Sequence, residues 1–102
     1  MSAKRNTYGY CNAYISHCAN YYFINEDKVN LAQVTKAQAD NYRCIDKALK
    51  HFDVTEVGVL RSVFTSGLPL VEAMRVLHCN SADSWGLVRK FIKMAADYRG
   101  LI

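Results

Sequence analysis

The stretch GLPLVEAMRVLHCNSADSWGLVRKFIKMAA, residues 67–96, predicts two helices joined by a tight turn. Pro69 suits the first turn of a helix, because its ring fixes φ and its missing N–H would have no intrahelical partner there. Four apolar residues then recur at spacings of three and four, which places them on one helix face that must be buried. These residues are Leu70, Ala73, Met74 and Leu77.

The second predicted helix follows a turn at residues 78–81. Asn80, Ser81 or Asp83 can accept a hydrogen bond from the free N–H groups that open this helix. Its apolar face comprises Trp85, Val88, Ile92 and Ala95 or Ala96, and its basic residues Arg89, Lys90 and Lys93 fall on other faces. A short helix, a brief turn and a longer basic helix are typical of a helix-turn-helix unit, here about residues 67–99.

Two segments of this unit resemble the helix-turn-helix in the C-terminal region of sigma factors. Residues 67–74, GLPLVEAM, resemble the opening of its first helix, and residues 81–85, SADSW, resemble the opening of its recognition helix. The chain differs from that pattern at Pro69, where a capping serine is usual, and at His78, where the turn usually has glycine.

The resemblance continues upstream. Residues 42–49, YRCIDKAL, and 57–64, VGVLRSVF, are similar to the layout of small phage transcriptional regulators of the RinA and ArpU type. It spans about residues 38–99. The resemblance implies a DNA-binding transcription regulator that derives from a phage or another mobile element.

Residues 7–24 predict a first helix that holds five of the seven tyrosines. Its apolar seam comprises Tyr8, Cys11, Ile15, Cys18 and Tyr22, and further tyrosines at 10, 14 and 21 lie off this seam. One interpretation is a platform on which unpaired bases stack. We favour the other, a helix between the core and a partner copy, because the basic residues that interleave stacking platforms are missing.

Two capping boxes predict two further helices. Thr35 with Gln38 opens a long helix, and Asp53 with Glu56 opens the next, because each pair can satisfy two free backbone N–H groups. Gly67 can end the second helix in the left-handed conformation. The predicted buried residues are Tyr42, Ile45, Leu49 and Phe52 in the first of these helices, and Val57, Leu60, Val63 and Phe64 in the second.

The predicted fold is all-α, a compact bundle of about five helices that ends in the helix-turn-helix. Strand-like alternation is absent from the sequence, and residues 25–35 read as a loop. A chain of 102 residues that is 51% apolar can form one domain, residues 1–102, around one core. Neither a membrane-spanning run nor a signal peptide is apparent, so we expect a cytoplasmic protein without a membrane partner.

Four cysteines and three histidines offer metal ligands, but their spacing argues against a metal site. Cys11 and Cys18 stand two helical turns apart, and no Cys-x-x-Cys pair occurs. We therefore favour reduced, buried thiols over zinc and expect no cofactor. Cys79 is either a redox-sensitive thiol at a helix N-terminus or a turn residue that fills a pocket. Enzyme motifs are also missing, so we predict no catalytic residues and no enzymatic activity.

The net charge of +4 permits a nucleic-acid partner without demanding one, because the excess in the C-terminal third is slight. We predict a transcription regulator that reads double-stranded DNA with the helix at about 81–98, as a homodimer and with the transcription machinery as a further partner. The predicted DNA-binding residues are Arg75, Asn80, Ser81, Asp83, Ser84, Arg89, Lys90 and Lys93.

The alternative is a helical protein-interaction or structural module that uses the tyrosine-rich first helix and does not bind DNA. The two interpretations differ in one arrangement. A DNA reader requires the basic residues of the C-terminal third to converge on one open face, whereas an interaction module allows them to be spread and paired with acids.

Overall fold

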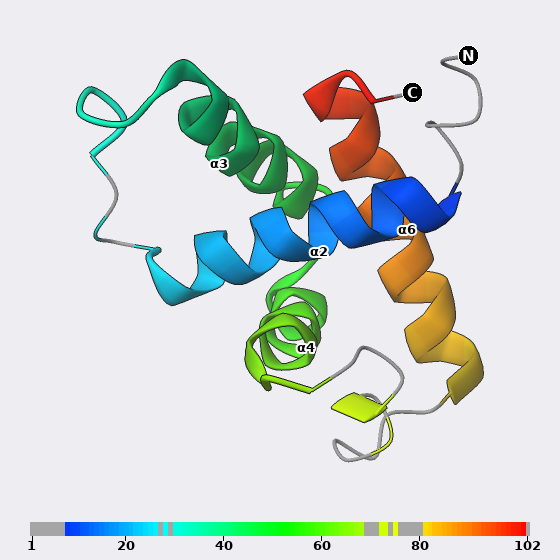
Figure 1. Ribbon diagram of the computed structural model, residues 1–102. Coiled ribbons are helices and arrows are strands. Elements are labelled where there is room, and N and C mark those ends of the chain that lie inside the picture. The colour runs from blue at the N-terminus through cyan, green and yellow to red at the C-terminus, as the bar shows by residue number, and fades with distance from the viewer. Residues whose placement is uncertain are drawn as a thin grey trace.

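The computed structural model describes residues 8–26, 28, 30–68, 72, 73, 75 and 81–101, and the side chains of these residues except 8–10 and 81–85. This part of the chain forms α-helices and contains no strand (Figure 1). The helices are α2 (Tyr8–Ile24), α3 (Lys36–Leu49), α4 (Val54–Thr65) and α6 (Ser81–Arg99). The predicted all-α fold is confirmed. None of these helices combines the length and the apolar character that a membrane span requires.

Helix α2 lies at the centre of the fold and packs against α3, α4 and α6 (Figure 1). The predicted seam is confirmed at Cys11, Ile15, Cys18 and Tyr22, all of which are buried. The helix also buries Ala19 and Phe23, which lie outside that seam. A helix surrounded on several sides by its own chain buries more than one stripe, and this explains the additional positions.

Both predicted capping boxes are present. The Thr35 hydroxyl accepts from the Gln38 N–H at 3.1 Å, while the Gln38 side chain accepts from the Thr35 N–H at 3.0 Å. Asp53 and Glu56 make the same reciprocal pair at 2.8 and 3.0 Å. Gly67 follows α4 with a φ of 78°, in the left-handed region as predicted. Caps of this kind are worth about 1 kcal/mol each and fix where α3 and α4 begin.

Helix α6 buries Val88, Ile92, Ala95 and Ala96, as its sequence pattern predicts. It also buries Phe91 completely, which the pattern analysis missed. The Phe91 ring meets the rings of Phe52 and Phe64 at centroid distances of 6.1 and 5.6 Å. Because α6 packs against both α2 and α3, it buries a wider arc than a single stripe.

The first half of the predicted helix-turn-helix falls mostly outside the described residues. Of residues 69–80, the structure places only Glu72, Ala73 and Arg75, which are helical, with Ala73 fully buried. The predicted fifth helix and the turn therefore stay predictions. The predicted inward side chain of Trp85 also lies outside the described part of the chain.

Candidate nucleic-acid interface

Of the predicted DNA-binding residues from Arg75 to Ser84, the structure describes the side chain of Arg75 alone. Arg75 is exposed, but its Nη1 atom lies 2.8 Å from Oε1 of Glu72, so its charge is paired within its own turn. Asn80 lies outside the described residues. Ser81, Asp83 and Ser84 belong to the first turn of α6, where the structure describes the backbone alone.

The basic residues in the middle of α6 lie on its exposed side. Arg89, Lys90 and Lys93 are all exposed, while the residues between them turn toward the core. Lys90 and Lys93 stand three positions apart, so their ammonium groups extend from neighbouring parts of one helix surface. Nζ of Lys90 lies 5.7 Å from the centroid of the Phe52 ring, a cation–π contact with the turn after α3.

Helix α3 adds further basic groups where its C-terminal end meets α6. Nζ of Lys47 lies 5.9 Å from the centroid of the Tyr98 ring. Nε2 of His51 is hydrogen-bonded to the Tyr98 hydroxyl at 2.8 Å, and the two rings stack with centroids 6.0 Å apart. All three side chains are exposed. The surface formed by Lys47, His51, Lys90, Lys93 and Tyr98 is called the α3–α6 basic face below.

Few acids neutralise the α3–α6 basic face. Among the described residues, none of the ion pairs includes Lys47, Lys90 or Lys93. Asp97, an exposed residue one turn after Lys93, is the nearby acid on α6. Asp46 of α3 is occupied, because it accepts a hydrogen bond from Tyr22 and lies 3.8 Å from Lys50. The face therefore carries an excess of positive charge.

The sequence missed the α3 half of this face. The helical pattern of α3 does not show that Lys47 meets Tyr98, which is far along the chain. Likewise, His51 gave no signal beyond its position after a helix. Pairings between distant helices depend on how the core packs, and helical periodicity alone does not specify them.

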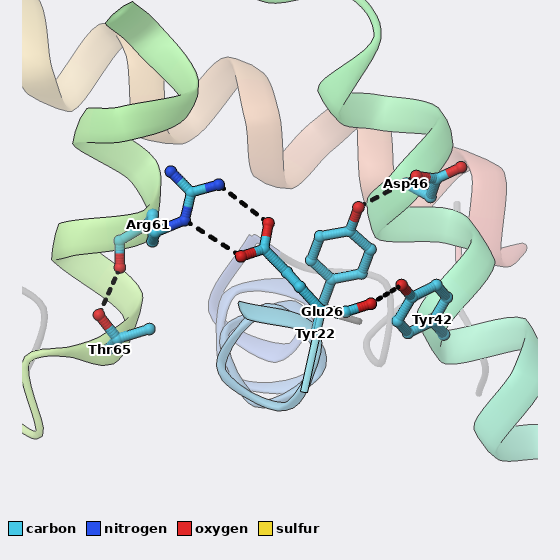
Figure 2. A network of polar contacts seen from close by, with 6 residues as sticks. All are labelled: Tyr22, Glu26, Tyr42, Asp46, Arg61 and Thr65. Atoms are coloured by element: carbon cyan, nitrogen blue, oxygen red, sulfur yellow. Dashed lines mark hydrogen bonds and ion pairs between the residues drawn. The ribbon is translucent and has the colours of Figure 1, made fainter. Parts of the chain in front are cut away.

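A second polar cluster lies where the C-terminal end of α2 meets α3 and α4 (Figure 2). Arg61 binds the carboxylate of Glu26 through two nitrogen atoms, at 2.9 and 3.3 Å. The backbone carbonyl of Glu26 accepts from the Tyr42 hydroxyl at 2.7 Å, and the Tyr22 hydroxyl donates to Asp46 at 3.0 Å.

The charges in this second cluster satisfy each other. Burial and the hydrogen bond to Asp46 raise the pKa of Tyr22, so its phenol stays protonated and remains a donor. The hydrogen bond with Glu26 raises the pKa of Arg61. The cluster therefore joins three helices, and its cation already has a carboxylate partner.

The described cysteines are free thiols in the core: Cys11, Cys18 and Cys44. The prediction of buried thiols is confirmed for these three, and Cys79 lies outside the described residues. Within the described part of the chain, no three His, Cys, Asp or Glu side chains are close enough together to hold a metal ion.

The chemistry available at the α3–α6 basic face is anion binding. Ammonium groups, an imidazole and a phenol can all form hydrogen bonds with phosphate oxygens, and those from a charged donor are the stronger ones. The ammonium groups of Lys47 and Lys90 lie over aromatic rings, and both lysine side chains are exposed. No protein-family model, curated protein or solved structure matches the chain.

Proposed function

We propose that this protein binds double-stranded DNA through the α3–α6 basic face and acts as a transcription regulator. The observation that supports the proposal most strongly is the placement of its lysines. Lys36, Arg61 and Arg75 each have a carboxylate partner at 2.8–3.1 Å, whereas Lys47, Lys90 and Lys93 have none among the described residues. Among the described residues, the acids that form ion pairs thus pair with other cations.

In the proposed binding mode, helix α6 approaches the DNA with its N-terminal end. The first turn of α6, which begins at Ser81, enters the major groove. The free backbone N–H groups of this turn favour contact with a phosphate at the edge of the groove. Lys90 and Lys93 then lie along the backbone of one strand, and Lys47 extends the contact from α3. A single helix reads few base pairs, so we expect sequence specificity to require a homodimer.

The alternative, a protein-interaction module built on the tyrosine-rich helix, has less support. Tyr22 is 8% exposed and donates to Asp46, and Tyr14 donates to Asn41 at 3.0 Å. These two aromatic side chains are therefore engaged inside the fold. Of the tyrosines predicted off the seam, Tyr14 and Tyr21 are half-buried, and the side chain of Tyr10 lies outside the described residues.

The experiment that tests the proposal is fluorescence anisotropy with a labelled random duplex and with the DNA upstream of the protein's own coding sequence. We expect the logarithm of affinity to fall linearly with the logarithm of salt concentration between about 50 and 200 mM. Lys90→Ala and Lys93→Ala should each weaken binding to both duplexes and reduce the salt slope by about one.

Lys36→Ala is the matched control. Lys36 is an exposed lysine on α3, but its ammonium group pairs with Asp40 at 3.1 Å, so its loss should leave the salt slope unchanged. If a protein that is folded by circular dichroism fails to bind either duplex at low salt, the proposal is wrong and the search turns to a protein partner.

A further inference from the structure

Two buried thiols on different helices belong to the same core. Cys18 of α2 is 1% exposed and Cys44 of α3 is 2% exposed. Hydrogen bonds from Tyr14 to Asn41 and from Tyr22 to Asp46 set the register of α2 against α3 on either side of these two thiols. The Cys44 thiol donates to the backbone carbonyl of Asn41 at 3.2 Å. The register therefore places two thiols from distant parts of the sequence opposite each other in the core.

A positive charge stands beside this pair. Nε of Arg99, in the last turn of α6, donates to the side-chain oxygen of Asn41, which also accepts from the Tyr14 hydroxyl. The guanidinium carbon lies 5.8 Å from the centroid of the Tyr14 ring. Arg99 is half-buried and held by two neighbours, so its charge has a fixed position near the thiols.

The two thiols differ in how readily they ionise. The hydrogen bond with Cys44 and the charge of Arg99 lower the pKa of Cys18, although burial opposes this effect. The hydrogen bond with Cys18 and burial raise the pKa of Cys44. Of the two thiols, Cys18 therefore loses its proton more readily.

A small hollow is lined in part by one of the two cysteines. It has a volume of about 80 Å³ and is lined by His17, Cys18, Tyr21, Gln38 and Asn41. Because one water molecule needs only about 10–15 Å³ of such space, a small oxidant can fit beside Cys18. Cys44 does not line the hollow, so it meets Cys18 only through the protein interior.

We propose that Cys18 and Cys44 form an oxidisable dithiol that hydrogen peroxide converts to a disulfide between α2 and α3. The Cys18 sulfur attacks one peroxide oxygen, the O–O bond breaks, and Cys18 becomes a sulfenic acid as one water leaves. The Cys44 sulfur then attacks the Cys18 sulfur, the S–O bond breaks, and a second water leaves. Both thiol protons end in water, and peroxide is the species reduced. This proposal is independent of DNA binding.

The test exposes the folded protein to hydrogen peroxide, then unfolds and alkylates it, digests it with trypsin and identifies linked peptides by mass spectrometry. Trypsin leaves Cys11 and Cys18 together in residues 6–28 and Cys44 in residues 44–47. We expect these two peptides to become linked, and a dithiol reductant to separate them.

Variants identify which thiol forms the link. The linked pair should persist in Cys11→Ser, which removes a buried thiol from the same helix, and disappear in Cys18→Ser. Arg99→Gln should slow formation of the link several-fold, whereas Arg43→Gln, which removes an exposed arginine from α3, should leave the rate unchanged.

Two results would overturn the proposal. One is recovery of Cys44 as a free thiol from folded wild-type protein after peroxide exposure that oxidises the same chain in urea. The other is a link that survives in Cys18→Ser. The wild-type measurement needs no variant to fold, so a destabilised variant does not leave the proposal untested.

Discussion

The protein uses its cations in two different ways, and the comparison separates structural charge from available charge. At the end of α2, Arg61 holds Glu26 with two hydrogen bonds and lies 5.4 Å from the Phe23 ring. On the α3–α6 basic face, Lys47 and Lys90 lie over aromatic rings and have no carboxylate partner among the described residues. The planar guanidinium suits a fixed carboxylate, whereas a solvated ammonium remains able to bind a mobile anion.

The polar cluster at the end of α2 and the α3–α6 basic face are built on one hydrophobic core. Phe91→Ala tests this and should have the largest effect on the free energy of unfolding. Phe91 is fully buried and contacts Phe52 and Phe64, so its truncation should lower the free energy of unfolding by about 3–5 kcal/mol. Urea denaturation followed by circular dichroism measures this loss. Val54→Ala is the control, since Val54 is 87% exposed. A loss no larger than that of Val54→Ala would show that Phe91 does not join the two regions.

Lys47→Glu tests whether α3 belongs to the DNA-binding surface, and its effect should be the second largest. Lys47→Glu should weaken DNA binding by about tenfold or more at low salt, which corresponds to about 1.4 kcal/mol. Its free energy of unfolding should fall by only about 1 kcal/mol, because Lys47 is exposed and loses a contact with Tyr98 and a favourable position in the last turn of α3. Anisotropy and urea denaturation measure the two quantities.

Lys28→Glu provides the matched control for this prediction. Lys28 is an exposed lysine in the turn after α2, and its replacement changes the net charge by the same amount. An equal loss of affinity in both variants would mean that net charge alone determines binding. The α3–α6 basic face would then have no special role.

Local sequence signals predicted most of the fold. The pairs Thr35 with Gln38 and Asp53 with Glu56 marked two helix starts, because a capping box depends on residues only three positions apart. The prediction failed at Phe91, where a second neighbouring helix buried a residue outside the main stripe. Packing partners from distant segments decide such positions, and a single helical pattern does not contain that information.

The candidate site was less predictable than the fold, for the same reason. Lys90 and Lys93 were identified from their own helix, and both are exposed. Arg75 was predicted in the same way, as a basic residue on a helix surface, but it forms an ion pair with Glu72. Lys47 and His51 join the site through Tyr98, a contact between two helices that the sequence does not specify. Residue type indicated charge, and only the fold distinguished paired charge from available charge.

Tyr22→Phe tests the polar cluster at the end of α2 with a smaller effect. Removal of the phenol that donates to Asp46 should lower the free energy of unfolding by about 1 kcal/mol near neutral pH. DNA affinity should not change. Tyr98→Phe, which removes a phenol that is 45% exposed, should cost less stability. If Tyr98→Phe lost more stability than Tyr22→Phe, the Tyr98 phenol would be the one that stabilises the fold, and the distinction between the two regions would be wrong.

The same residue gives the cluster a defined dependence on pH. The pKa of Tyr22 in the folded protein lies above the ordinary value of 10.0, chiefly because the phenol is buried. Above about pH 10 the unfolded chain therefore loses a proton that the folded protein keeps, and stability falls as pH rises. Below that pH the contribution is fully present. Urea denaturation at about pH 8 and about pH 11 should show a smaller alkaline loss in Tyr22→Phe than in wild type.

The smallest effect on the free energy of unfolding is expected for the ion pair between Arg61 and Glu26. The Arg61 and Glu26 side chains are 44% and 34% exposed, so water screens their attraction. Arg61→Gln should therefore cost only about 0–1 kcal/mol, and a double-mutant cycle with Glu26→Gln isolates the pairwise contribution.

The effect of Arg61→Gln on DNA binding distinguishes the polar cluster at the end of α2 from the α3–α6 basic face. Arg61→Gln removes one positive charge, as Lys90→Ala does, yet it should leave both DNA affinity and its salt slope unchanged. The reason is that the Arg61 guanidinium already has an anion as its partner, so it has no counterion to exchange for phosphate. If Arg61→Gln weakened DNA binding as much as Lys90→Ala, pairing with a carboxylate would not determine which cations bind DNA. The distinction between structural and available charge would then be lost.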